Sequence, residues 1–255
     1  MTIRLTPEKI KHIKELVKQT IDSIRHKKPP KKPQKRLVAK LIGCLIASLP
    51  AIMYGALYYK YLEKEKIAAL KSCKGNFDAF ISLSENAKYE LDWWLNHIDT
   101  SFNPIRYPPV DVVLYSDASL KGWGAVQEEI STGGRWTAVE AKCHINVLEL
   151  HTVLLALKCF KVSITTKHVQ ILVDNTTAVA LINHMGSVHS DSCHLMARKI
   201  WEFCFRNDIW LTAAHLPGAT NVDADHASRN FISVDTEWML NSTCLVEALE
   251  TSISP

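Results

Sequence analysis

Apolar residues recur at three- and four-residue spacing near the start of the chain, which is the spacing of one helix face. They are Ile10, Ile13, Leu16, Val17, Ile21 and Ile24. Thr6 can cap this helix and Pro7 fits its first turn, so the pattern predicts a helix over 6–25. The Pro- and Lys-rich residues 26–34 cannot continue it, because proline lacks the amide hydrogen that a helix needs.

Residues 41–59 contain no charged side chain, a length that approaches a membrane span. Pro50 lies in the middle of this run, and charged residues resume directly after it. Proline disfavours a continuous helix. We therefore predict two buried helices, over 35–48 and 51–63, and we do not expect a membrane segment.

A further helix is indicated by Ser84, which can act as its N-terminal cap and is followed by Glu85. This helix is expected to end at His97. It carries the pair Trp93-Trp94, which is interpreted as a packing anchor, with a base-stacking platform as the alternative.

The second half of the chain alternates between strand and helix patterns. Strands are predicted at 111–116, 122–129, 135–140, 169–173 and 209–214, with Gly133-Gly134 as the second turn; helices are predicted at 146–160, 176–184, 191–206 and 222–228. The order β-β-β-α-β-α-α-β-α predicts an α/β fold with a mixed five-stranded sheet, in which three antiparallel strands join two parallel ones. Right-handed crossovers place the ends of the first and fourth strands side by side.

Four carboxylates stand where these strands end or helices begin: Asp117, Glu149, Asp174 and Asp225. Each belongs to a segment with apolar residues that should be buried, and buried carboxylates are costly unless they are paired. Hard divalent cations such as Mg²⁺ take carboxylate oxygens, water and substrate phosphates as ligands. The four residues therefore predict metal-assisted phosphodiester chemistry.

Helix capping is the alternative for two of these residues. Asp174 can cap the helix that starts at 176, and Asp225 lies in a first helical turn, where acidic residues are favoured. Capping does not explain Glu149 on the apolar face of VLELHTVLLAL, nor Asp117 after Tyr-Ser. The set as a whole favours a catalytic site.

Residues beside the carboxylates carry a family resemblance. They are Gly122-Trp123-Gly124-Ala125, Asn146 three residues before Glu149, Asn175 after Asp174, and His215-x-Pro-Gly-x-x-Asn-x-x-Ala-Asp225. With these motifs, residues 110–230 resemble type 1 ribonuclease H, and in particular the ribonuclease H domain of DIRS-type retroelement polyproteins. The resemblance implies a ribonuclease H-like fold with flanking helices.

The resemblance also implies an activity, which is endonucleolytic hydrolysis of the RNA strand of RNA–DNA hybrids with two Mg²⁺ ions, or Mn²⁺ as a substitute. Asp117 is expected to bridge the ions, with Glu149 and Asp174 on one and Asp225 on the other. His215 is expected to move a proton, with a loop histidine without a role as the alternative. Contacts to the substrate are expected from Ser119, Asn146, Asn175 and Thr176. Asn146 would bond the RNA 2′-hydroxyl or cap its helix, or both.

The domain organisation is expected to be a helical region over 1–100, a linker over 101–110, a ribonuclease H-like domain over 111–230 and a C-terminal tail over 231–255. The helical region resembles the thumb and connection of a DIRS-type reverse transcriptase. No Tyr-x-Asp-Asp polymerase signature is present. A polymerase domain acting in cis or in trans is therefore an expected partner.

Charge is unevenly distributed along the chain. Residues 1–36 carry a net charge of +9 within a total of +4, which leaves −5 for the remainder. The basic start favours either contact with a phosphate backbone or a solvated helix face. The seven cysteines include no CxxC pair and are typical of reduced thiols, and 26–34 has the composition of a nuclear localisation signal. We expect an intracellular protein, nuclear or cytoplasmic.

Two further interpretations remain. The Lys-rich protrusion by which some ribonucleases H hold the hybrid is missing near residue 190, which favours a non-catalytic nucleic-acid-binding or interaction remnant of a reverse transcriptase as the alternative function. Four residues in this loop have the chemistry of zinc ligands, namely His184, His189, Cys193 and His194. Their spacing fits no standard zinc pattern, so we do not predict zinc.

Overall fold

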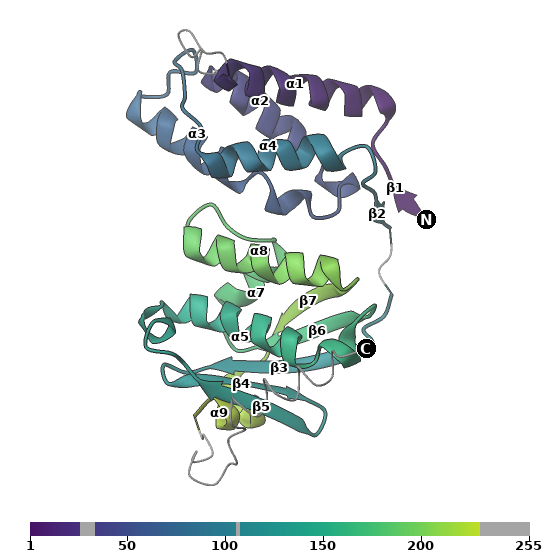
Figure 1. The fold of residues 1–255 in the computed structure, drawn as a ribbon, viewed down its shortest axis with the longest axis vertical. Helices are drawn as coiled ribbons and strands as arrows, with labels where there is room; N and C mark the ends of the chain where they lie inside the picture. Colours follow the sequence, from purple (N-terminus) through teal and green to yellow (C-terminus); the bar gives the residue numbers. More distant parts are fainter. Residues whose placement is uncertain (26–33, 106–107, 230–255) are drawn as a thin grey trace, which may run out of the picture.

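The computed structural model describes residues 1–25, 34–105 and 108–229. The helices of the first hundred residues form one part, and a five-stranded sheet with its helices forms the other (Figure 1). The proposed nuclear localisation segment lies almost wholly outside the described residues, and the proposed tail over 231–255 lies entirely outside them.

The helical part contains α1 (Pro7–Arg25), α2 (Lys35–Ile46), α3 (Lys60–Ser72) and α4 (Glu85–His97). The predictions for α1 and α4 are confirmed, including Ser84 as the cap that accepts a hydrogen bond from the Ala87 amide. Trp94 is fully buried and donates its indole N–H to the Tyr58 carbonyl, as a packing anchor should. Short strands β1 (Thr2–Ile3) and β2 (Asn103–Pro104) pair with each other.

The predicted helix over 51–63 is wrong. The chain instead makes two short 3₁₀ turns, η1 (Leu49–Ala51) and η2 (Gly55–Leu57), and α3 begins only at Lys60. Tyr54 has a φ of 65°, in the left-handed region that interrupts a right-handed helix. Pro50 sits inside the first 3₁₀ turn, where its missing amide hydrogen costs no helical bond.

The sheet has the order β5-β4-β3-β6-β7. Its strands are β3 (Val112–Ala118), β4 (Gly122–Gln127), β5 (Ile130–Arg135), β6 (His168–Val173) and β7 (Trp210–His215). The pairs β3–β4 and β4–β5 are antiparallel, whereas β3–β6 and β6–β7 are parallel. This topology confirms the predicted mixed sheet of the ribonuclease H-like fold, with the first and fourth of the predicted strands adjacent.

Helices cover both faces of this sheet. They are α5 (Ile145–Cys159), α6 (Lys161–Ile164), α7 (Thr176–Asn183), α8 (Asp191–Arg206) and α9 (Val222–Arg229), with 3₁₀ turns η3 (Glu140–Lys142) and η4 (Gly218–Thr220). In Figure 1, α5 and α8 lie on the side of the sheet that faces the helical part, and α9 lies on the opposite side. The helices predicted over 146–160, 176–184, 191–206 and 222–228 are confirmed to within one residue at each end.

The third strand was predicted five residues too late. Gly133-Gly134 is not a turn but part of β5, and the chain reverses at Glu128, whose φ is 54°. Glycine is needed inside this strand because a Cβ on Gly133 would lie 2.6 Å from the Trp123 carbonyl oxygen and 2.8 Å from that of Ala227. Gly133 therefore allows α9 to approach the sheet closely.

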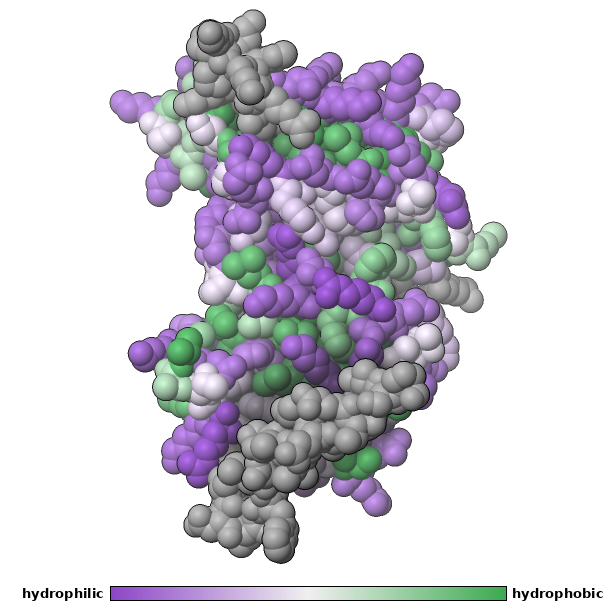
Figure 2. Space-filling view, viewed as in Figure 1, coloured by the Kyte–Doolittle hydropathy of each residue, from purple (hydrophilic) through white to green (hydrophobic). Residues whose placement is uncertain are grey.

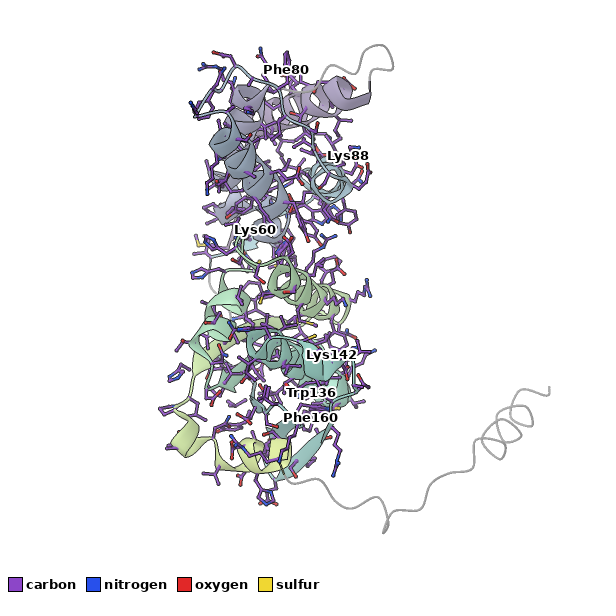
Figure 3. The ribbon with its side chains drawn as sticks, turned by 90° about the vertical axis from the view of Figure 1, so that its left-hand side faces the viewer. Lys60, Phe80, Lys88, Trp136, Lys142 and Phe160 are labelled. Carbon is purple, nitrogen blue, oxygen red and sulfur yellow. The ribbon has the colours of Figure 1, made fainter. Side chains whose placement is uncertain are left out.

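The two parts meet along α8. Tyr54 of the helical part packs against Trp201, Phe205 and Trp210 of the sheet part, and Lys64 forms an ion pair with Asp191 at 2.5 Å. In Figure 3, Lys60 is labelled at the level where the two parts join, between Lys88 and Lys142. Residues from both parts also line a cavity of about 520 Å³.

The face seen in Figure 2 carries mostly hydrophilic residues, with smaller hydrophobic groups between them. The uncharged run over 41–59 is folded into short helices and turns, many of whose side chains are buried in the core. Within the described ranges, no helix has the length and apolar character that crossing a membrane requires.

Candidate metal centre

Two of the four carboxylates are brought together by the parallel pairing of β3 and β6. Tyr115 is the register partner of Leu172. Asp117 and Asp174 each lie two residues further along, so they emerge at the same edge of the sheet. Asp117 is still within β3, and Asp174 directly follows β6.

The helix α5 supplies the third carboxylate. Glu149 lies in its second turn and is 3% exposed. One oxygen atom from each of Asp117, Glu149 and Asp174 lies within 4.8 Å of the others. The structure thus gathers three carboxylates that are far apart in the sequence.

Burial raises the pKa of two carboxyl groups in this cluster, those of Glu149 and Asp117. Desolvation, followed by the negative charges of Asp117 and Asp174, raises the pKa of Glu149 to about 9, while a backbone hydrogen bond from Ala118 opposes the shift. Its atom Oε2 has no hydrogen-bond partner among the described residues. Burial also raises the pKa of Asp117 above its usual value, and a hydrogen bond from Ser228 lowers it. Both carboxyls are therefore disfavoured as anions unless a cation is present.

These residues fit a hard divalent cation. The three side chains offer only oxygen ligands, and Glu149 Oε2 is a buried oxygen that lacks a donor. A buried polar atom without a partner is destabilising. A bound cation would both satisfy this oxygen and offset the repulsion among the three carboxylates.

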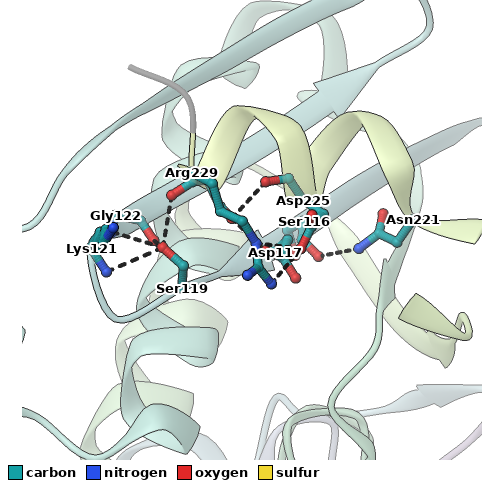
Figure 4. Close-up of polar contacts among 9 residues, drawn as sticks. Ser116, Asp117, Ser119, Lys121, Gly122, Asn221, Asp225 and Arg229 are labelled. Carbon is teal, nitrogen blue, oxygen red and sulfur yellow. Dashed lines mark hydrogen bonds and ion pairs between the residues drawn. The ribbon is translucent and has the colours of Figure 1, made fainter. Parts of the chain in front are cut away.

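Helix α9 holds Asp117 from the other side. Ser228, which is fully buried, donates its hydroxyl to Asp117 Oδ2 at 2.6 Å. Asn221, directly before α9, donates to the Ser116 carbonyl at 3.1 Å (Figure 4). A Cβ on Gly124 would lie 2.4 Å from the Ala224 carbonyl oxygen, so glycine lets α9 sit this close. Our reading of the sequence assigned no role to Ser228, although it stands three residues after Asp225.

The fourth carboxylate is not part of the group. Asp225 lies on the partly exposed side of α9, where its Oδ1 accepts from Arg229 Nε at 2.7 Å and pairs with Nη2 at 2.6 Å. Its negative charge still raises the pKa of Asp117, and the positive charge of Arg229 lowers it. Both residues are therefore close enough to Asp117 to influence its charge.

His215 is the last residue of β7 and is exposed. It is the register partner of Val173, the residue before Asp174. The following turn approaches the site as well, since a Cβ on Gly218 would lie 3.1 Å from Asp174 Oδ2. The histidine loop thus borders the carboxylate group.

Some of the side chains expected to contact a substrate form hydrogen bonds within the protein. Asn175 caps α7 by accepting from the Ala178 amide at 3.0 Å, and its side-chain amide donates to Asn146 Oδ1 at 3.0 Å. Capping is therefore not the role of Asp174. Asn146 does not cap α5 either, because His144 is the capping residue. Thr176, at the start of α7, is exposed.

Ser119 lies in the turn between β3 and β4. Its hydroxyl donates to the Ser228 carbonyl at 2.7 Å and accepts from the amides of Lys121 and Gly122 (Figure 4). The hydroxyl is thus engaged by the turn and by α9. Its hydrogen is therefore not free to be donated to a substrate, as the prediction required.

The loop that offered zinc-type ligands forms no metal-binding group. Among the described residues, the three carboxylates are the group of His, Cys, Asp and Glu with the geometry to hold an ion. His194 is buried against the edge of Tyr61, with ring centroids 5.1 Å apart. Desolvation lowers the pKa of His194 to about 4, so its ring packs as a neutral aromatic group.

Three comparisons were made with known proteins, and the matches found are to solved structures. No family model matches the chain, and no curated protein sequence matches it. Ribonuclease H1 of the archaeon Halobacterium salinarum is 17% identical over 46% of this chain and 92% of its own, with a TM-score of 0.38. LC11 ribonuclease H1 in complex with an RNA/DNA hybrid is 17% identical over 46% of this chain and 93% of its own, with a TM-score of 0.40.

A foamy viral protease–reverse transcriptase, solved with an RNA/DNA hybrid, is 12% identical over 93% of this chain, with a TM-score of 0.30. This chain spans 30% of that longer protein. The assignment of the fold rests on the strand order and register described above.

Proposed function

We propose that this chain is a ribonuclease H, an endoribonuclease that hydrolyses the RNA strand of RNA–DNA hybrids with the help of two Mg²⁺ ions. The observation that carries the proposal is the group formed by Asp117, Glu149 and Asp174 at the carboxyl edge of parallel strands. A capping role explains none of the three, since Asn175 and His144 are the caps of the neighbouring helices.

Asp117, Glu149 and Asp174 would hold one ion, and Asp117 and Asp225 the other. When bound, a pair of such ions activates water and stabilises the leaving oxygen of a phosphodiester. Both contacts of Asp225 with Arg229 use Oδ1, so this role would fall to Oδ2 or require that ion pair to break. The hydroxyl of Ser228 orients Asp117 by donating to its Oδ2, which would leave the other carboxylate oxygen for an ion.

His215 is proposed as the proton carrier. It is exposed, it ends the strand next to β6, and the turn that follows it approaches Asp174. An imidazole in such a place can take a proton from water or deliver one to the product. Its exposure leaves the ring free to move between the site and solvent.

Recognition of RNA is assigned to the start of α5 and α7. Asn146 Oδ1 already accepts from Asn175, which orients its side-chain amide group, so its N–H groups remain for an RNA 2′-hydroxyl. Thr176 is exposed beside this pair. The hydroxyl and the backbone groups of Ser119 are all hydrogen-bonded within the protein, so its contact with a substrate stays a prediction.

We further propose that the chain derives from a DIRS-type retroelement, with residues 1–100 as a thumb- and connection-like part and 111–230 as the catalytic domain. A polymerase domain, in cis or in trans, would add grip on the hybrid.

A non-catalytic, nucleic-acid-binding remnant is the second candidate. The ion pair between Asp225 and Arg229 favours it, because this pair neutralises the carboxylate expected to complete the second ion site. The two functions differ in whether divalent ions bind and whether RNA is cut.

The test is cleavage of a labelled RNA–DNA hybrid by the purified chain with Mg²⁺, compared with Asp174→Asn. Asp223→Asn is the matched control, because it removes an exposed carboxylate from α9 near Asp225. We expect cutting of the RNA strand alone, lost with Asp174→Asn or EDTA and kept in Asp223→Asn. No cleavage with or without an added polymerase fragment, from a folded protein, would reject the enzyme and favour the binding remnant.

A further inference from the structure

A buried lysine and a cysteine meet at the end of the helical part that is farthest from the sheet. Lys35 is the first residue of α2 and is 3% exposed. Its ammonium group donates to the Ala69 carbonyl at 2.9 Å and lies 2.7 Å from the sulfur of Cys73. Phe80, labelled at the top of Figure 3, marks this end, because it bridges to Gln34.

The charge of Lys35 has no carboxylate partner in the described part of the chain: it belongs to none of the ion pairs found there. Residues 26–33, just upstream, contain no Asp or Glu. A buried ammonium group needs a counter-charge, since burying an unpaired charge is costly. The sulfur of Cys73 is the group in contact that can become an anion.

Cys73 is placed to act as that anion. It follows the last residue of α3 and is half-buried, so the residue is partly open to solvent. The turn after it is fixed by Gly75, whose φ is 84°. The hydrogen bond from Lys35 is the main cause that lowers the pKa of the Cys73 thiol, and backbone bonds from Asn76 and Gly75 act in the same direction.

We propose that Lys35 and Cys73 form an oxidation-sensitive pair, which a peroxide converts into a covalent sulfur–nitrogen bond between the two side chains. The Cys73 thiolate attacks one oxygen of hydrogen peroxide, which gives a sulfenic acid and, with one proton from Lys35, water. The freed amine then attacks the sulfur and expels a second water. In sum, thiolate, ammonium and one peroxide give the sulfenamide and two waters, so that sulfur is oxidised and peroxide reduced.

The bond would join two elements that already touch. The backbone amides of Lys35 and Arg36 donate to the carbonyls of Ala79 and Phe77, so the start of α2 is held beside the chain that follows α3. A covalent link between residues 35 and 73 would fix the start of α2 to the end of α3. The contact geometry needs little rearrangement, because nitrogen and sulfur are already 2.7 Å apart.

The test treats the full chain with hydrogen peroxide and analyses peptides by mass spectrometry. The expected product joins the Lys35 and Cys73 peptides, weighs two hydrogens less than their sum and is reversed by a thiol reductant. The variant Lys35→Arg keeps the positive charge but removes the primary amine, so Cys73 should oxidise without cross-linking. Cys73→Ser should give no product at all.

Reactivity of the thiol gives an independent measurement. At neutral pH, iodoacetamide should alkylate Cys73 at least about tenfold faster than the exposed Cys143 and Cys159, because the thiolate is the nucleophile. Lys35→Met, which keeps the buried stem, should remove this advantage. Equal alkylation rates, or a stable sulfenic acid in the unaltered chain without any cross-link, would overturn the proposal.

Discussion

Among the described residues, each part of the molecule buries one glutamate, and the two differ in their hydrogen bonding. In the helical part, Glu90 is fully buried and both of its oxygens accept backbone N–H groups, from Tyr61 at 2.9 Å and from Leu62 at 3.0 Å. In the sheet part, Glu149 is equally inaccessible, yet its Oε2 has no partner and its nearest charges are two other carboxylates.

This difference indicates that Glu90 has a structural role, whereas Glu149 is placed to bind a cation. Glu90 completes the first turn of α3, whose free amides need acceptors. Glu149 lies in a helix interior and caps nothing; its position costs stability unless a cation is bound. The same substitution, glutamate to glutamine, should therefore have opposite consequences at the two sites.

The largest effect is expected from Glu149→Gln. Losing a metal ligand should lower the rate of RNA cleavage by about three orders of magnitude, since ion stabilisation of the transition state supplies several kcal/mol. The variant should also be at least as stable as the original protein in EDTA, because it removes a buried carboxyl group that must take up a proton when the chain folds at neutral pH. Cleavage assays and thermal unfolding with and without Mg²⁺ measure both.

Unchanged cleavage in this variant would remove Glu149 from the proposed site. A loss of stability in EDTA would instead show that the carboxylate is structural, like Glu90. Glu90→Gln serves as the matched control for the charge change at a buried position.

Glu90→Gln should destabilise the protein by about 1–3 kcal/mol, because its amide N–H₂ would face a backbone N–H and leave one donor unsatisfied. The stabilisation that Mg²⁺ gives should remain, since Glu90 belongs to the other part of the molecule. Chemical denaturation with and without Mg²⁺ checks both statements. A loss of the Mg²⁺ effect would mean that the two parts do not behave independently.

The next effect is expected in the pH dependence of the free energy of unfolding, to which both glutamates contribute. The pKa is raised by burial to about 9 for Glu149 and to about 8 for Glu90, both from 4.5. The folded protein then holds protons that the unfolded chain has lost, so metal-free stability should fall as pH rises from about 5 to 9.

Removing the Glu149 contribution should make this decline shallower in Glu149→Gln, by up to about 1.4 kcal/mol per pH unit. Saturating Mg²⁺ should have a similar effect on the original protein, because the ion favours the ionised carboxylate. Unfolding temperatures recorded across this pH range provide the measurement. The same slope in the variant and the original protein would contradict the raised pKa of Glu149.

Much of the fold could be predicted because its signals are local. The period of apolar residues and the caps located α1, α4 and α8, and the order of strands gave the parallel pairing that joins Asp117 to Asp174. The wrong predictions fall where tertiary contacts, and not the local sequence, determine the secondary structure. Gly133-Gly134 resembles a turn in sequence, but it lies inside β5, where the missing side chain of Gly133 makes room for α9 and that of Gly134 makes room for the Trp123 ring.

The site was predictable to the same extent. Three of the four carboxylates converge as expected, because strand ends and a helix turn fix their directions. The role of Ser228 was missed, since a serine hydroxyl that bonds a carboxylate 111 positions away leaves no local pattern. The ion pair of Asp225 could have been predicted from the sequence, because Arg229 stands four residues later on the same helix.

That ion pair gives the smallest expected effect. Arg229 and Asp225 are largely exposed, so their bond should contribute below about 1 kcal/mol. Arg229→Gln should free Asp225 and remove a positive charge near Asp117, which should strengthen Mg²⁺ or Mn²⁺ binding by up to about fivefold. Arg206→Gln is the control for net charge, because Arg206 is exposed and forms a longer i,i+4 pair with Glu202 on α8, at 3.9 Å. Calorimetric titration measures the ion affinity; equal gains in both variants would indicate net charge alone, whereas a gain in Arg229→Gln alone would mean that Arg229 competes with the cation for Asp225.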